Sequence, residues 1–539
     1  MNRFFKGFAL LIALTCAVWV AVLWNWQNTQ HEISVPDVVI YLGALPLTLF
    51  ALVLMTRWAW QGASAKAAAG SAAGSVAGSV KGTAAVETGA NAAGTSERFR
   101  TWQLLAAHGN TVLGCAPADW ASAAADQAPR PKLDDELRNG EGLPVLSARV
   151  QGVDVTEVAE ALEAIATPLR QQDAQQQVSA QLVRALALLQ EPLAAAVQAL
   201  VPWSAQLMKP PLSGAGVGSA SGAMNEAAAA KASAASNLLD ARVRVLLAWP
   251  TDGSGLDHEV ALRWLTSQLH QLGEGLVDTG RWAVNVVPSA ASRPLNTTSN
   301  DKKQTSLSGP ELWLQADALM QAQARNERCD ALLLLACHSD LVPETVDQLD
   351  AQGRLFSSQH PKGVIPGEAA AALLVAPAEW PADPDAQAPV PHLHRAAVAA
   401  RDKSVDAAGR TAHTLSTQLV QQALAAAQLS ATEVAALAND ADQHTPRAAE
   451  VFGCMLEQLP ALDATDDMRM TGQLCGSTGA CGTLLAVAMA AHLASKLEKP
   501  CLALSVGDSI WRAALVVRPQ APPGAGSDTA AANKPVSQA

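Results

Sequence analysis

Aromatic and charged residues are both scarce in this sequence of 539 residues. Aromatic side chains make up 4% of the chain, with 1 Tyr and 7 Phe against 14 Trp, and charged residues make up 16%. Lys and Arg together number 37 and Asp and Glu number 49, so the net charge is −12. A chain with this deficit of positive charge has no broad face that neutralises phosphates. The composition therefore argues against nucleic acid as a partner.

Cysteine is thinly spread. The 8 cysteines lack the short, regular spacing of a secreted disulfide-rich domain, so we expect a reducing compartment. Cys475 and Cys481 flank a Gly-rich turn, but no second pair or His follows at zinc-ligand spacing, so we predict no metal site and no cofactor. Phosphate-binding loops of the Gly-x-x-x-x-Gly-Lys-Ser/Thr type are also missing, which argues against P-loop chemistry.

Two long apolar runs, from Gly7 to Trp26 and from Val38 to Trp60, are each long enough to cross the hydrocarbon core of a bilayer. The loop between them has no Lys or Arg, whereas basic residues flank the pair at Arg3, Lys6, Arg57 and Lys66. A cleavable signal peptide is the alternative, but the first run is too long and ends in Trp-Asn-Trp. Residues 1–61 are therefore predicted to be a two-span hairpin in the bacterial inner membrane, anchored in its lipid bilayer, with the N-terminus and the large C-terminal region in the cytoplasm.

Low-complexity segments suggest the organisation of the remainder. Ala, Gly and Ser dominate residues 62–95 and 213–236, which we predict to be flexible linkers, and residues 520–539 are predicted to be a disordered tail. Apolar residues spaced three and four apart make residues 96–212 a largely helical cytoplasmic region. From residue 237 to residue 519, short apolar strands alternate with amphipathic helices, which predicts an α/β layered domain with helices covering a mixed sheet.

Three motifs stand out in this last region. The first is the strand, loop and turn from Cys329 to Pro377, whose turn residues are Gly363, Pro366, Gly367 and Glu368. The second is a loop before a helix that carries Arg447 and Glu450, and the third is the Gly-rich turn with Gly476, Gly479 and Gly482. In their order and spacing these motifs resemble β-ketoacyl synthases and other thiolase-like proteins. The resemblance covers residues 329–519 and extends more weakly over residues 239–327 as a shortened first half. It implies a thiolase-like fold, with Glu368 and Glu450 as structural residues.

The chemistry of that family needs a cysteine thiolate at the N-terminus of a buried helix and two polar side chains, usually His, aimed at the thioester carbonyl. The matching helix begins near Ser308 and Gly309, and no cysteine lies there. Gly476 occupies the place of one of the two His residues. The resemblance therefore implies a catalytically degenerate member, with no catalytic residues of its own.

We accordingly expect a membrane-anchored, non-catalytic thiolase-like protein that acts as a binding or assembly module. Its partners are expected to be proteins, and degenerate relatives suggest an accessory role in a bacterial type VI secretion system; the family also implies a homodimer through this domain. One alternative is a membrane-associated enzyme of acyl transfer or lipid synthesis of the ketosynthase type, with Ser308 or Cys337 as nucleophile, and another is a structural scaffold. Cys337 to Asp340, and His392 with His394, are interpreted as loop residues.

Overall fold

The computed structural model describes residues 101–125, 131–170, 177–209, 238–249, 255–286, 308–326, 328–383, 389–407 and 412–519. The predicted transmembrane hairpin, the two linkers and the tail lie outside the described residues. Ala85–Ala539 form one compact unit, and the description below concerns this unit alone.

An internal repeat organises the fold. In the first half, strand β4 pairs in parallel with β5 and β6, and β6 pairs antiparallel with β7, which in turn pairs antiparallel with β1. The elements of this half are β1 (Thr101–Asn110), α7 (Ala180–Gln198), β4 (Val243–Ala248), α10 (Gly255–Leu272), β5 (Trp282–Val286), α11 (Gly309–Arg325), β6 (Ala331–Ser339) and β7 (Glu368–Pro377).

The second half repeats this pattern. Strand β10 pairs in parallel with β11 and β12, β12 pairs antiparallel with β13, and β13 pairs antiparallel with β8 and β9. Its elements are β8 (His392–His394), β9 (Ala397–Ala400), α13 (Thr414–Ala427), β10 (Ala436–Asn439), α14 (Thr445–Gln458), β11 (Met468–Met470), α15 (Thr471–Cys475), α16 (Cys481–Leu497), β12 (Cys501–Ser505) and β13 (Trp511–Arg518). The two halves thus have the same order of strands and of covering helices.

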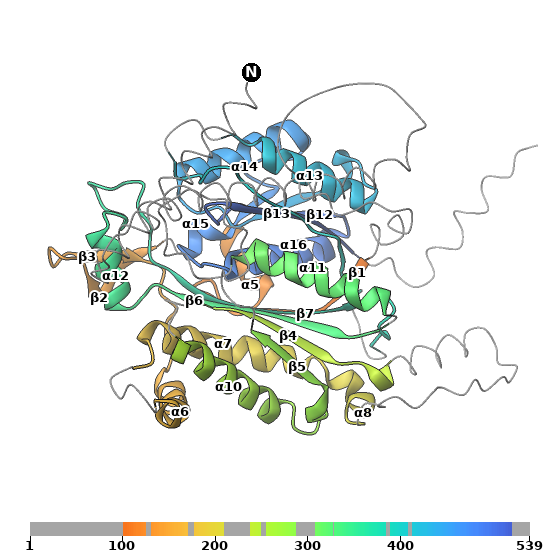
Figure 1. Cartoon of the computed structure of the whole chain (residues 1–539). Coiled ribbons are helices and arrows are strands. Elements are labelled where there is room, and N and C mark those ends of the chain that lie inside the picture. The colour runs from red at the N-terminus through yellow and green to blue at the C-terminus, as the bar shows by residue number, and fades with distance from the viewer. Residues whose placement is uncertain are drawn as a thin grey trace, which may run out of the picture. The chain divides into compact units, whose positions relative to one another are not determined.

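The halves stack as alternating layers (Figure 1). α7 and α10 cover the outer face of the first-half strands, α11 and α16 lie between the two sets of strands, and α13 and α14 cover the outer face of the second half. Strand β8 joins the halves, because it pairs with both β1 and β13 in an 11-stranded sheet. Helix α16 is apolar all round and buried from Cys481 to Ala494 on nearly every side, as the middle layer requires.

Smaller elements complete the described chain. A lobe with its own small core of Leu137, Val145, Leu341, Val346 and Leu355 consists of a hairpin and a helix, β2 (Lys132–Arg138), β3 (Pro144–Ser147) and α12 (Pro343–Ala351). The remaining helices are α5 (Pro117–Ala125), α6 (Thr156–Ala166) and α8 (Ser204–Leu207). Segment Ala180–Leu207 is long and apolar enough to cross a membrane by length and composition alone. It is a core segment here, because α7 packs against β1, β6 and β7.

The predicted alternation of strands and helices from residue 237 onward is confirmed as an α/β layered fold with a large mixed sheet. Residues 96–212, which we expected to be a separate and largely helical region, instead supply β1 and α7 to the first half of the repeat. The first half is therefore not shortened. β1 escapes the sequence pattern because its segment, TWQLLAAHGN, neither alternates nor is rich in β-branched residues. His392 and His394, expected in a loop, form β8. Cys337 to Ser339, also expected in a loop, are the last residues of β6.

Candidate functional site

Two of the predicted motifs meet in space. The backbone N–H of Ser477 donates to the carbonyl oxygen of Ile365 at 2.9 Å, and Pro366 and Ser477 form a β-bridge. Gly367 has no room for a side chain, because a Cβ there would overlap the carbonyl oxygen of Cys475. Gly476 has a φ of +63°, a conformation that favours glycine. The Pro-Gly-Glu turn and the Gly-rich turn are thus one packed unit, while Gly363 lies apart, against the backbone of Leu355.

Glu368 is the first residue of β7 and is fully buried. Its carboxylate accepts two hydrogen bonds from Arg184, at 2.6 and 2.8 Å, and one each from the Ser339 hydroxyl at 2.9 Å and the Val150 N–H at 2.8 Å. A buried carboxylate is costly unless its oxygens are paired in this way. All four donors are protein groups, so the hydrogen bonds of the Glu368 carboxylate are made within the fold.

His338 lies at the end of β6, beneath the Gly-rich turn. Its Nε2 is 3.1 Å from Asp340 Oδ1, and a Cβ on Gly479 would lie 2.6 Å from its Nδ1. Burial acts to lower the pKa of His338, but the charge of Asp340 and its hydrogen bond, together with Glu368, raise that pKa above its ordinary value. Gly479 has a φ of +52° and was predicted to form the turn; the structure places it directly on this imidazole.

The N-terminus of α11, where the family carries its nucleophile, is closed. Both the N–H and the hydroxyl of Ser308 donate to Glu311 Oε2, at 3.0 and 2.9 Å, and the Glu311 N–H is 3.3 Å from the Ser308 oxygen, a reciprocal helix cap. A Cβ on Gly309 would overlap Thr483 and lie 2.6 Å from the Ala480 carbonyl oxygen. The first turn of α16 thus fills the space in front of α11, and Ser308 is held as a cap.

The described thiols are all poor nucleophiles. Burial is the largest cause that raises their pKa values, to about 11 for Cys115 and to about 12 for Cys329, Cys454, Cys475 and Cys501. The pKa of Cys337, at the end of β6, and that of Cys481, whose thiol donates to the Ala369 carbonyl, are raised further, again by burial. The thiolate is the nucleophilic form of cysteine, so a raised pKa lowers the reactivity of these side chains at neutral pH.

Asp440 is a buried carboxylate that the sequence analysis did not select. It follows β10, and its Oδ1 accepts from the N–H groups of Val506 and Gly507, at 2.6 and 2.9 Å, while its Oδ2 accepts from the Ser505 hydroxyl at 2.6 Å. Burial raises its pKa, although these hydrogen bonds oppose the shift. Gly482 packs beside it, with a Cβ position 3.1 Å from the Asp440 Cβ. The sequence signal that could have identified Asp440 is its position directly after the buried strand β10.

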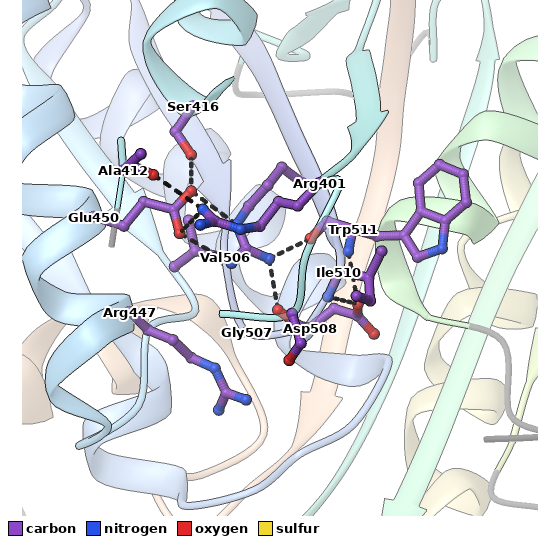
Figure 2. A network of polar contacts seen from close by, with 12 residues as sticks. Arg401, Ala412, Ser416, Arg447, Glu450, Val506, Gly507, Asp508, Ile510 and Trp511 are labelled. Carbon is purple, nitrogen blue, oxygen red and sulfur yellow. Dashed lines mark hydrogen bonds and ion pairs between the residues drawn. The ribbon is translucent and has the colours of Figure 1, made fainter. Parts of the chain in front are cut away.

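Glu450 is the centre of a second buried ion network (Figure 2). Arg512 donates to both of its oxygens at 2.9 Å, Arg401 is 2.9 Å away, and Ser416 also donates to it. Figure 2 shows Arg447 apart from this network, and its guanidinium instead pairs with Asp442 and lies 3.7 Å from Asp406. The predicted Arg447 and Glu450 therefore share α14 but belong to two different clusters. The Glu450 cluster joins α14 to α13 and β13, and the Arg447 cluster joins it to the loops with Asp442 and Asp406.

A cavity of about 480 Å³ opens at the end of β1, between the segment 149–154 and α7. Cys115 donates to Glu191 there at 3.3 Å, and Asn110, Gln190 and Asp154 also line it. None of the predicted motif residues lines this cavity. Among the described residues, no group of three or more His, Cys, Asp and Glu side chains is arranged to hold a metal ion.

No family model and no curated sequence matches this chain. Solved structures do match this chain. An ishigamide ketosynthase/chain length factor is 16% identical, with a TM-score of 0.44, over 78% of this chain and 100% of that one. A β-ketoacyl synthase from Burkholderia phymatum STM815 is 13% identical, with a TM-score of 0.43, over 78% and 100%. A mutant form of the ketosynthase from module 6 of the bacillaene synthase from Bacillus subtilis 168 is 11% identical, with a TM-score of 0.41, over 78% and 71%. The chain is thus structurally similar to β-ketoacyl synthase domains over 78% of its length.

Proposed function

We propose that this protein is a non-catalytic thiolase-like binding or assembly module, anchored in the bacterial inner membrane by residues 1–61. The observation that carries the proposal is the closed N-terminus of α11. Ser308 is engaged with Glu311, and the Ala480 carbonyl and the Thr483 side chain pack directly against Gly309 at the start of the helix. Catalysis depends on a positioned and activated nucleophile, and the capping contacts of Ser308 and the burial of Cys337 argue against either residue in that role.

The test is acylation of the purified full-length chain in detergent. After incubation with acyl-CoA or acyl-carrier protein, intact mass spectrometry should show no covalent adduct, and no condensation or thioester hydrolysis should be measured. A stoichiometric adduct that disappears in Ser308→Ala or Cys337→Ala would overturn the proposal and favour the acyl-transfer alternative. An adduct that survives both changes would overturn it as well, with another residue as nucleophile.

The membrane anchor is tested separately. A reporter fused after Lys66 should report the cytoplasm, and a reporter near Glu32 should report the periplasm, because basic residues flank the two apolar runs and are absent between them. Export of the reporter after Lys66 would refute the proposed membrane topology.

A protein partner follows from the binding role, and a component of a type VI secretion system is the candidate that the family resemblance suggests. Co-purification from solubilised membranes, with the partner identified by mass spectrometry, tests that assignment.

A further inference from the structure

Helix α14 turns an apolar stripe away from the core. Val451, Cys454 and Met455 face inward and belong to the hydrophobic core of the second half. On the other side, Phe452 is 39% exposed and Leu456 is 73% exposed, and the neighbouring Ala449 is exposed as well. The spacing of three and four residues places these side chains in one line along the helix. Figure 1 shows α14 in an outer layer, and among the described residues nothing covers the stripe.

The internal repeat shows what covers the corresponding helix. Helix α10 follows the first parallel strand of its half, as α14 does in the second half. There, α6 packs across α10, and Val158 and Leu162 of α6 share a hydrophobic cluster with Val260 and Trp264 of α10. The fold thus places an amphipathic helix on this position in one half and leaves it open, within the described chain, in the other.

The charges around the stripe favour one kind of binding partner over others. Glu457 is exposed in the last turn of α14, where the helix dipole is also negative, and its Oε2 lies 3.0 Å from His413 Nε2. Asp463 and Asp466 are exposed in the loop that follows α14. The adjacent exposed positions of α13 are uncharged glutamines, and Arg447 is already paired with Asp442. This acidic border repels an anionic membrane surface, and a second copy of the chain would place acid against acid.

We infer that the stripe of α14, consisting of Ala449, Phe452 and Leu456, docks an amphipathic helix of a partner protein that carries Lys or Arg beside its apolar face. The partner helix takes the place that α6 takes on α10. The apolar stripe supplies the anchoring contact, and the acidic residues at the end of α14 select the basic partner. This inference does not depend on the proposed non-catalytic role, since α14 lies outside the closed N-terminus of α11.

The first test uses α6 itself as the probe. Two labelled peptides of residues 154–170 are compared, one with the natural sequence and one with exposed Glu157, Glu160 and Glu163 replaced by Lys. The Lys peptide should bind the full-length chain in detergent, measured by fluorescence anisotropy, and Leu456→Glu should weaken it by about tenfold or more. The natural, acidic peptide should bind more weakly, and added salt should reduce the difference. Leu133→Glu is the matched control, because Leu133 is 63% exposed in the separate β2–β3 hairpin.

Three results would overturn the inference. Failure of the Lys peptide to bind, or binding that Leu456→Glu does not change, would remove the docking site. Dimerisation of the full chain that Leu456→Glu abolishes would assign the stripe to a second copy. Flotation with anionic vesicles of phosphatidylglycerol, lost in Leu456→Glu, would assign it to the membrane. Because Leu456 is exposed, the variant should keep the parent melting temperature, so loss of binding is not confused with unfolding.

A second test is photo-crosslinking from position 456 in cells. The crosslinked site in the partner should lie in a helix with basic residues beside an apolar face, and a crosslink to an acidic or non-helical segment would contradict the inference.

Discussion

Arg184 of α7 and Glu368 of β7 form a buried ion pair, with Nε and Oε2 2.6 Å apart, between two segments that the sequence pattern separated into different domains. The side chain of Glu368 is fully buried and that of Arg184 is 15% exposed. Together they join α7 to β7, the last strand of the first half.

Loss of this pair should destabilise the whole fold. Glu368→Gln leaves the Arg184 guanidinium without its counter-charge, so we expect a loss of about 3–5 kcal/mol in the free energy of unfolding. Guanidinium chloride denaturation measures it. Glu259→Gln is the control, because Glu259 pairs with Arg263 on the surface of α10, where such pairs contribute about 0.3–0.5 kcal/mol. Equal effects of the two variants would contradict the buried role of Glu368.

Residues 237–519 alone should not fold, although they were predicted to be a domain. Without β1 and α7 the first half loses its fifth strand and its outer helix, and β7 becomes an exposed apolar edge. A fragment of residues 101–519 should elute as a folded species in size-exclusion chromatography, whereas the shorter fragment should aggregate. A monomeric, cooperatively unfolding 237–519 fragment would refute the unity of the two regions.

Gly367 should tolerate no side chain. Gly367→Ala places a methyl group against the backbone carbonyl of Cys475, which cannot move aside as a side chain can, and overpacking of this kind costs about 1–3 kcal/mol. Gly142→Ala is the matched comparison: its φ of +80° is strained for alanine, but nothing lies within 4 Å of the added Cβ. Thermal unfolding should therefore show the larger decrease for Gly367→Ala, and the reverse order would exclude steric contact as the cause.

Stability should fall with acidification between pH 6.5 and pH 4 through His394. Burial, with the nearby charges of Arg518 and His392, lowers the pKa of His394 from 6.5 to about 4 in the folded state. The unfolded chain therefore binds a proton in this window that the folded chain does not, so stability decreases as the pH falls. His394→Asn should flatten the pH dependence of the unfolding free energy there. His338 and His444 have raised pKa values and act with the opposite sign, because their contribution is lost as the pH rises above 6.5.

The described thiols should resist modification. Their pKa values are raised to about 11 or higher, so their thiolate fraction at neutral pH is very small, and all of them except Cys115 are buried. In a Cys16→Ser variant of the full chain, Ellman's reagent should react slowly with the native protein and with all the remaining thiols after unfolding. Rapid, stoichiometric labelling of a single native thiol at neutral pH would identify an activated cysteine and contradict this account.

The sequence predicted β10, β12 and β13 because each is a short apolar run between helices of clear period, as in CLALSVG for β12. The shorter strands β8, β9 and β11, of three or four residues each, were not predicted. It could not place β1, whose burial depends on pairing with β7 and β8, far away in the chain. At the candidate site, the sequence identified the turn glycines as motif residues. It did not show that the turn with Gly367 packs against the turn with Gly476, about a hundred residues further along the chain. Asp440 was missed because its role depends on the backbone of Val506 and Gly507, which sequence proximity does not reveal.

The pairing of β1 with β7 also has a consequence during synthesis. The side chain of Gln103 in β1 donates to the carbonyl oxygen of Ala378, a separation of 275 residues. At about 5–20 residues per second, the ribosome takes roughly 15–55 s to add that length of chain. For this interval β1 lacks its partner β7, and α7 lacks a strand against which it packs, so apolar surface stays uncovered until β7 leaves the exit tunnel.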